Sequence, residues 1–256
     1  MHTSEIIGLF IAAAAAGVIN AVAGGGTLVT FPVLLWFGMP PVVANATSTV
    51  ALVLGTAGSI FGYRRHVAMV RGWLSRFLPV SILGGLLGGI LLTRTSNEVF
   101  GKLVPFLILF ATLLFLAQGA FRRRVGFDGS GGVRRQSVAV AILFQFAVAV
   151  YGGYFGAGIG ILMLASLGFI GLSNIYEMNA LKTILGSLIN LVAALWFITA
   201  GLVDWPRALV MSAGALGGYF LGAHFSQRIS QRAVRLIITG VGFVIAAVMF
   251  YKQFCR

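Results

Sequence analysis

Two glycine-rich tracts interrupt apolar stretches at matching places in the two halves of the chain, at 23–27 and 156–160. Glycine allows the backbone to leave a helix, and the helix that then restarts presents unpaired N–H groups and a partial positive charge. Because such a helix end binds anions, the tracts predict a site for an oxyanion. The backbone and hydroxyl candidates are Gly24, Gly25, Gly26, Thr27, Gly156, Gly158 and Gly160.

Close helix packing is the alternative interpretation of these glycines, since small residues allow membrane helices to approach one another. We prefer the binding site because the interruptions are paired in the two halves of the chain. Two further glycine groups, at 84–89 and 217–222, lie in long uninterrupted stretches, and we interpret them as packing faces.

Polar side chains follow each tract and are the next candidates for substrate contact. They are Asn45, Thr47, Ser48 and Thr49 in the first half and Asn179, Lys182 and Thr183 in the second. A lysine at the centre of a membrane helix costs about 2.5–3.5 kcal/mol, so it is usually paired, functional or close enough to the surface to snorkel. Both substrate contact and snorkelling stay open for Lys182. For the neutral side chains the alternative is a hydrogen bond between helices.

The residues that enzymes and metal sites need are sparse. Cys255 is the single cysteine, which excludes an intrachain disulfide and a multi-cysteine metal site. No P-loop motif is present, and the three histidines, His2, His66 and His224, stand at the expected ends of segments. We therefore expect no enzymatic activity, no cofactor and no metal.

The composition predicts an integral protein of the lipid bilayer. The 256 residues are 59% hydrophobic and 9% charged, with a mean hydropathy of +1.01. Soluble domains carry about 25% charged residues. The net charge of +13 does not indicate nucleic-acid binding, because the arginines stand in short loops between apolar stretches.

The chain repeats itself at a fixed offset of 134 residues. The offset superposes Gly24 on Gly158, Gly26 on Gly160, Asn45 on Asn179, Ala46 on Ala180, Thr49 on Thr183, Gly84 on Gly218 and Gly88 on Gly222. An ordered series of this kind indicates duplication. We expect one transmembrane repeat over 1–120, a basic cytoplasmic linker over 121–135 and a second repeat over 136–256.

Each repeat contains five apolar segments, so the fold is expected to be all-α. The segments are expected at 5–22, 27–38, 44–63, 73–93, 100–120, 136–155, 159–171, 178–200, 206–224 and 233–251. The second segment of each repeat is too short to cross a bilayer, which takes about 20 residues. The first two segments therefore form a broken or re-entrant pair that meets at the glycine tract. In a bilayer, such backbone must be buried in protein or line a wet cavity, so the site is expected near mid-membrane.

Charge placement predicts that the two repeats are inverted. Basic loops stay cytoplasmic, and the loops at 64–76, 121–135 and 228–235 are rich in arginine. The loop at 201–207 carries one acidic and one basic residue and is expected outside. Both termini then face the periplasm. The first apolar stretch has no basic residue before it, so we expect it to be retained.

Several motifs resemble the TauE/SafE family of sulfite and organosulfonate exporters. They are the run AGVINAVAGGGTLVTFP at 16–32, GMPP at 38–41, ATST at 46–49, GGYFGAGIG at 152–160 and NALKT at 179–183. The resemblance covers nearly the whole chain and implies a multi-pass transporter of the bacterial inner membrane that moves sulfur-containing anions. Two positions depart from the family pattern: many members carry an acidic residue at Asn20 and a further glycine at Thr27.

The few acidic residues favour export of a small anion such as sulfite or a sulfonate. With the cytoplasm negative, outward movement of a monoanion is favoured by about 2.3 kcal/mol per 100 mV, so it needs no coupling carboxylate. Apart from Glu177 and Asp204, both near segment ends, no acidic residue remains to relay protons through the core. The alternatives are an anion channel and a non-transporting membrane subunit that anchors a soluble partner through its basic loops.

Overall fold

The computed structural model is all-helical over the residues that it describes, 1–22, 24–63, 67–124, 135–169, 175–225 and 231–254. The helices are α1 (Thr3–Val22), α2 (Thr27–Trp36), α3 (Pro41–Tyr63), α4 (Val67–Arg94), α5 (Asn97–Arg124), α6 (Arg135–Tyr154), α7 (Ile159–Phe169), α8 (Ile175–Thr199), α9 (Trp205–Phe225) and α10 (Gln231–Phe254). Every expected segment is therefore a helix. Position 23, most of the linker at 125–134 and the arginines Arg64, Arg65 and Arg228 lie outside the described residues.

Several helices begin earlier than the apolar pattern predicts. Helix α4 starts at Val67 rather than at residue 73, and α5 starts at Asn97 rather than at residue 100. The extra turn of α4 contains Arg71, and that of α5 contains Glu98. Polar residues at a membrane surface can continue a helix into water, so the apolar stretch marks only the part of the helix that lies in hydrocarbon.

By length and composition, five of the described helices can cross a membrane. These spans are Thr3–Ala21, Val70–Arg94, Asn97–Ala117, Glu177–Thr199 and Leu236–Gln253. Helices α2 and α7 have 10 and 11 residues. At 1.5 Å per residue they reach about 15–17 Å, roughly half of the hydrocarbon core. The expectation that these two segments are too short to span alone is therefore confirmed by their length.

The helical pairs break at glycines whose backbone other residues rarely adopt. Gly24 and Gly25 have φ of 80° and 98°, and Gly156 and Gly158 have φ of 83° and 78°. At positive φ a Cβ would clash with the backbone, which explains why glycine recurs at both places. At the offset of 134 residues Gly24 and Gly158 superpose with nearly the same φ, whereas Gly25 corresponds to Ile159 and Gly156 to Val22, which are helical. The two breaks thus share one left-handed glycine and differ around it.

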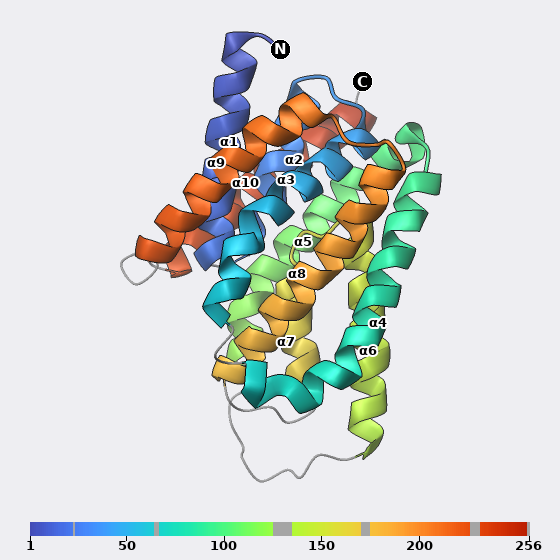
Figure 1. Cartoon of the computed structure of the whole chain (residues 1–256). Coiled ribbons are helices and arrows are strands. Elements are labelled where there is room, and N and C mark those ends of the chain that lie inside the picture. The colour runs from blue at the N-terminus through green and yellow to red at the C-terminus, as the bar shows by residue number, and fades with distance from the viewer. Residues whose placement is uncertain (23, 64–66, 125–134, 170–174, 226–230, 255–256) are drawn as a thin grey trace.

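Helices of each half of the chain pack against helices of the other half. Helix α1 packs along α9, and α6 packs along α4, while α3 contacts α9 and α8 contacts α4. Each of these contacts has a counterpart: α1 with α9 corresponds to α6 with α4, and α3 with α9 corresponds to α8 with α4. Two further contacts, α3 with α8 and α5 with α10, join equivalent helices of the two halves. Figure 1 shows the α1–α9 and α4–α6 pairs on opposite sides of the bundle, with the start of α1 and the end of α10 toward the same end.

Glycines allow α9 to contact the backbone of α1, and α4 to contact the backbone of α6. A Cβ on Gly218 of α9 would overlap the carbonyl oxygen of Ala14, and one on Gly88 of α4 would overlap that of Val150. Gly222 and Gly84 stand as close to their partner helices, whereas Gly217 faces open space. The glycine groups of α4 and α9 are therefore packing faces, as predicted, with Gly217 as the exception.

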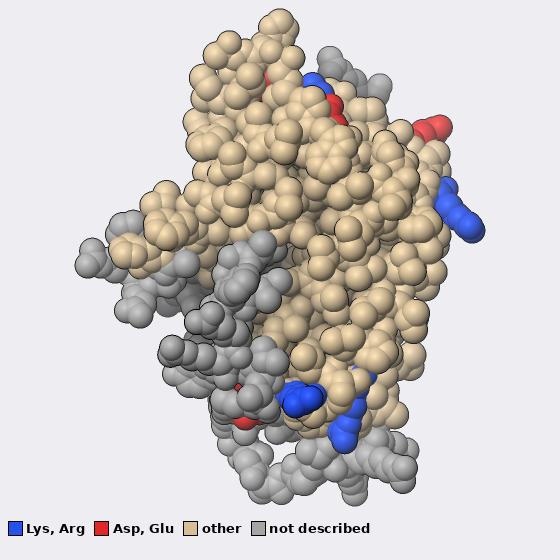
Figure 2. Space-filling model, viewed as in Figure 1, with Lys and Arg blue, Asp and Glu red and all other residues tan. Residues whose placement is uncertain are grey.

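The outer surface between the helix ends is apolar. Large apolar side chains lie on this surface: Leu143 exposes 70% of its area and Phe220 exposes 74%. In Figure 2 the described residues at mid-height show neither Lys or Arg nor Asp or Glu, and charged side chains gather toward the two ends. Such a band suits the hydrocarbon of a bilayer.

Gly218 and Gly217 offer a matched test of the packing. We expect Gly218→Ala to lower the melting temperature of the detergent-purified protein, because its methyl group would push α9 away from α1. Gly217→Ala should leave it unchanged or raise it, since alanine favours a helix by up to about 1 kcal/mol. Scanning fluorimetry of both variants measures the difference. Equal shifts would contradict backbone contact at Gly218.

Candidate functional site

The first break is closed by side chains of the protein itself. The Gly26 N–H donates to Oδ1 of Asn20 at 2.7 Å, which ties the end of α1 to the start of α2. The side chain of Asn20 also shares a hydrogen bond with Tyr219 of α9. One of the amides expected to hold an anion is therefore already occupied. Asn20 drew attention in the sequence only as a departure from a family pattern.

The polar residues that face the first break also bond to one another. The hydroxyls of Thr30 and Ser48 lie 2.6 Å apart and link α2 to α3, and the Thr30 hydroxyl also approaches the Gly26 carbonyl. Both side chains are fully buried. The Thr49 hydroxyl donates to the carbonyl of Asn45 on its own helix. For Ser48 the bond to Thr30 is the hydrogen bond between helices that is the alternative to substrate contact, whereas the bond of Thr49 lies within α3.

The second break has more unbonded amides than the first, in which the amides of Gly24 and Gly26 have acceptors and those of Gly25 and Thr27 have none among the described residues. In the described structure the amides of Gly158, Ile159 and Gly160 donate no hydrogen bond, and the Gly158 carbonyl accepts from Ile161. A Cβ on Gly160 would lie 3.2 Å from Cδ of Lys182, so the lysine stem runs along the start of α7. Lys182 is half-buried and forms no ion pair with a described residue. A cation and free N–H groups therefore meet at this helix end.

The repeat offset explains the contrast between the two breaks. Lys182 stands where the first half has Ser48, and Tyr154 stands where it has Asn20. The Tyr154 hydroxyl reaches Thr95 instead of the break. Two breaks at corresponding places thus carry different side chains, and only the second combines unbonded amides with a lysine side chain.

One aromatic ring lies against both breaks. A Cβ on Gly25 would overlap the ring of Phe115 in α5, and one on Gly158 would lie 3.7 Å from it. Phe115 is fully buried. The breaks therefore approach each other across this ring. Nothing in the sequence distinguishes Phe115 from the other phenylalanines of the chain.

Asn45 of α3 meets the end of the helix that leads into the second break. Its Nδ2 donates to the carbonyl oxygen of Tyr154 at 3.0 Å, and the side chain is 1% exposed. Its Oδ1 has no hydrogen-bond partner. Asn179 and Thr183 of α8 are half-buried, and their side chains form no hydrogen bond with other described residues. The structure thus brings Asn45, through α6, and Lys182, through α7, to one junction.

A sequence model of the sulfite exporter TauE/SafE family matches residues 9–249. The chain belongs to the TauE/SafE family. It is 31% identical to a probable membrane transporter protein of Haemophilus influenzae, with 96% of this chain and 94% of the relative aligned. It is 29% identical to the probable membrane transporter protein YfcA of Escherichia coli K12, over 96% and 89% of the two chains. No solved structure matches the chain significantly.

Together with the candidate spans, the family makes this chain an integral membrane protein and a membrane transporter of the TauE/SafE type. The resemblance drawn from the motifs is confirmed, and so is the all-helical fold. The named relatives are described as probable transporters without a substrate.

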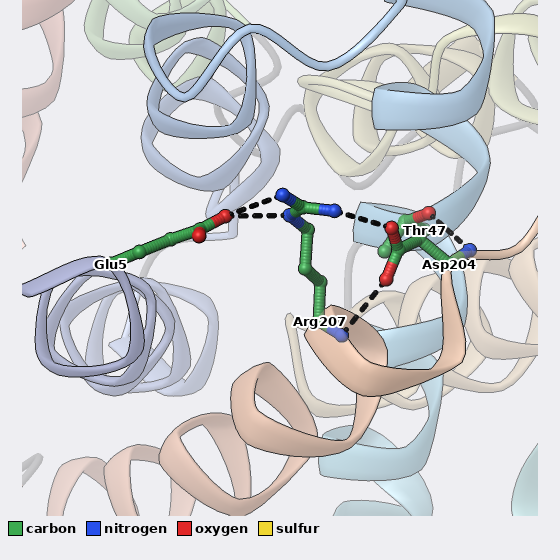
Figure 3. A network of polar contacts seen from close by, with 4 residues as sticks. All are labelled: Glu5, Thr47, Asp204 and Arg207. Carbon is green, nitrogen blue, oxygen red and sulfur yellow. Dashed lines mark hydrogen bonds and ion pairs between the residues drawn. The ribbon is translucent and has the colours of Figure 1, made fainter. Parts of the chain in front are cut away.

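Thr47 lies in a different cluster of this TauE/SafE protein, at the end of the bundle where α9 begins. Its hydroxyl accepts the N–H of Asp204 at 3.1 Å. Figure 3 shows Arg207 between Asp204 and Glu5, and its Nε donates to the Glu5 carboxylate at 2.7 Å. The side chains of Arg207 and Glu5 are 25% and 9% exposed. The network joins α1, α3 and the α8–α9 loop, so Thr47 positions a loop in this structure.

Glu5→Gln tests how much this network contributes to stability. Loss of the charged hydrogen bonds to Arg207 should lower the free energy of unfolding by about 1–3 kcal/mol, because the pair is partly buried. Glu98→Gln, which breaks the exposed pair with Lys102, is the control and should change little. Thermal unfolding of both purified variants measures the effect. If Glu5→Gln has the melting temperature of wild type, the network does not contribute to the stability of the protein.

Proposed function

We propose that this transporter exports small sulfur-containing anions, sulfite or organosulfonates, across the bacterial inner membrane and binds them at the start of α7. The observation that carries the proposal is the placement of Lys182 along a helix end whose amides are unbonded. A helix N-terminus carries about half a positive charge, and an added ammonium group makes it attractive for an anion.

A sulfonate or sulfite group matches the donors at this helix end. Its oxygen atoms accept hydrogen bonds from the amides of 158–160, and the Lys182 ammonium balances its charge. Asn179 stands three residues before Lys182 on α8 and lies near its face of the helix, whereas Thr183, one residue after it, is turned about 100° away. Asn179 supplies a further neutral hydrogen bond, and Thr183 borders the site. Gly156 gives the turn that lets the segment double back.

The first break serves the site differently. Its Gly26 amide is bonded to Asn20, and Ser48 replaces the lysine, so we assign to Gly24, Gly25, Gly26 and Thr27 a role in packing the first break against Phe115. Under this assignment the anion site is one-sided and belongs mainly to the second repeat. The ring of Phe115 separates the two breaks and keeps their backbones apart.

The distribution of acidic residues supports export without proton coupling. Glu5 and Asp204 bind Arg207, and Glu98 pairs with Lys102 at the start of α5. Among the described residues no carboxylate stands in the middle of a helix. An anion leaving a negative cytoplasm moves with the membrane potential and needs no coupled proton.

The exchange of helices between the halves supports two inverted repeats. In Figure 1, α1 begins at the upper end of the bundle, and its counterpart α6 begins at the lower end. We therefore place 1–120 and 136–256 in the membrane in opposite directions, with both termini in the periplasm and the linker 121–135 in the cytoplasm. Rocking of one set of helices against the other would expose the site alternately to each side.

Lys182→Met tests the proposed site. In proteoliposomes, we expect wild type to move sulfite or small sulfonates and Lys182→Met to lose at least about tenfold in flux, because methionine keeps the stem and removes the charge. Lys102→Met is the control, since that lysine lies exposed at the start of α5. Thiosulfate, sulfate and chloride complete the anion panel. Flux that does not saturate with substrate would indicate a channel.

Two results would overturn the proposed function. One is the absence of flux above that of empty liposomes for every anion tested. The other is an unchanged flux in Lys182→Met. If charge reversal at 122–124 abolished function in cells while anion binding persisted, a subunit that anchors a soluble partner would be favoured instead.

A reporter fused after Arg256 tests the orientation. The arginine-rich loops predict a periplasmic C-terminus, so alkaline phosphatase at this position should be active and green fluorescent protein dark. The same pair of reporters inserted in the linker at 121–135 should show the reverse pattern. A fluorescent C-terminal fusion would refute the proposed orientation.

A further inference from the structure

Asn45 presents a buried hydrogen-bond acceptor with nothing bound to it. Its side chain is 1% exposed, and Oδ1 is the one side-chain nitrogen or oxygen atom, among the buried atoms of the described residues, that lacks a partner. An acceptor that is removed from water and left unpaired destabilises a protein. An unpaired group that persists in a functional interior therefore points to a partner that comes and goes.

The orientation of the Asn45 amide is fixed by its other contact. Nδ2 donates to the carbonyl oxygen of Tyr154, which can only accept. The NH₂ group must therefore face Tyr154, and Oδ1 points away from it. An exchange of the two atoms would set oxygen against oxygen and would leave two acceptors unpaired.

The unpaired oxygen and the proposed anion site adjoin opposite ends of the segment that joins α6 to α7. Asn45 contacts the last residue of α6, and Lys182 contacts the second residue of α7. The short segment between them is folded back by Gly156 and Gly158, and the Tyr151 hydroxyl donates to the carbonyl of Ala157 at 2.8 Å. The C-terminus of α6 is the negative end of its helix dipole, and the N-terminus of α7 is the positive end.

We propose that Asn45 Oδ1 accepts a hydrogen bond from the transported anion, so that the site selects anions that carry a donor of their own. The anionic group binds at Lys182 and α7, and a hydroxyl group on the same molecule binds at Asn45 and α6. Hydroxyalkyl sulfonates and hydrogen sulfite have this chemistry. Alkyl sulfonates without a donor lack it. This inference rests on the proposed function.

A metal cation fits the same oxygen less well. Cations such as sodium are held in transporters by several oxygens from carbonyls and side chains. Here only one buried side-chain oxygen in the described part of the chain is free, and the Ala157 and Tyr154 carbonyls already accept hydrogen bonds. A single donor group satisfies one acceptor completely. A resident water molecule is the remaining alternative, and it would give no selectivity among substrates.

Two anions of equal charge and similar size test the inference on the wild-type protein. They are 2-hydroxyethanesulfonate and propane-1-sulfonate, which differ by a hydroxyl in place of a methyl group. We expect the transporter in proteoliposomes to favour the hydroxyl compound by about three- to tenfold in initial rate at low concentration, the value of one net hydrogen bond.

Variants assign the preference to Asn45. In Asn45→Leu the ratio between the two sulfonates should fall to about one, because no acceptor remains for the hydroxyl group. Thr112→Val removes another buried polar group, whose hydroxyl donates to Ile108 on its own helix, and should keep the wild-type ratio. If Asn45→Leu does not fold, the inference is tested by the ratio of the two sulfonate transport rates in wild type, and a ratio of one would overturn it.

The outcomes separate the two proposals. Equal rates for both sulfonates in wild type, together with a loss of flux in Lys182→Met, would overturn the selection by Asn45 and leave the proposed anion site standing. A preference for the hydroxyl compound that survives Asn45→Leu would also overturn it. If neither sulfonate moves and no other anion does, the proposed function fails and the inference fails with it.

Discussion

Backbone polar groups cannot face lipid unpaired, and the rest of this structure follows from that constraint. Two breaks in the helices leave N–H and C=O groups without helical partners, and in this structure protein surrounds them. Helices close enough to do so need small residues at their contacts, which Gly88 and Gly218 provide. Asn20 and Tyr151 then satisfy polar groups inside the enclosure.

The two breaks show how a duplicated backbone can be divided between structural and chemical tasks. In the first half, an asparagine caps the restarted helix and a pair of hydroxyls joins it to its neighbour. In the second half, the positions of both cap and hydroxyl carry other residues, and a lysine stem covers the helix start. Different side chains thus give the first break hydrogen bonds within the protein and place a lysine side chain at the second.

Much of this arrangement can be read from the sequence, because it depends on local properties. Positive-φ glycines, the lengths of apolar segments and the packing glycines all leave a signal in residue type and spacing, and Lys182 is conspicuous among apolar neighbours. The Phe115 ring, the Asn20 cap and the ion pair of Glu5 with Arg207 leave none, since they join residues far apart in the chain. Thr47 and Ser48 are adjacent in sequence yet bind different partners, a distinction that only the three-dimensional packing reveals.

The pairing of α1 with α9 bears on how the protein is made. Helix α1 leaves the ribosome first, but its partner begins only at Trp205, when most of the chain has been synthesised. Until then the face around Gly17 has no helix against it and must be covered by lipid or by the insertion machinery. Helix α4 likewise waits for α6. Membrane insertion and assembly are therefore separate stages for this protein, and the first half completes its packing only after the second has entered the bilayer.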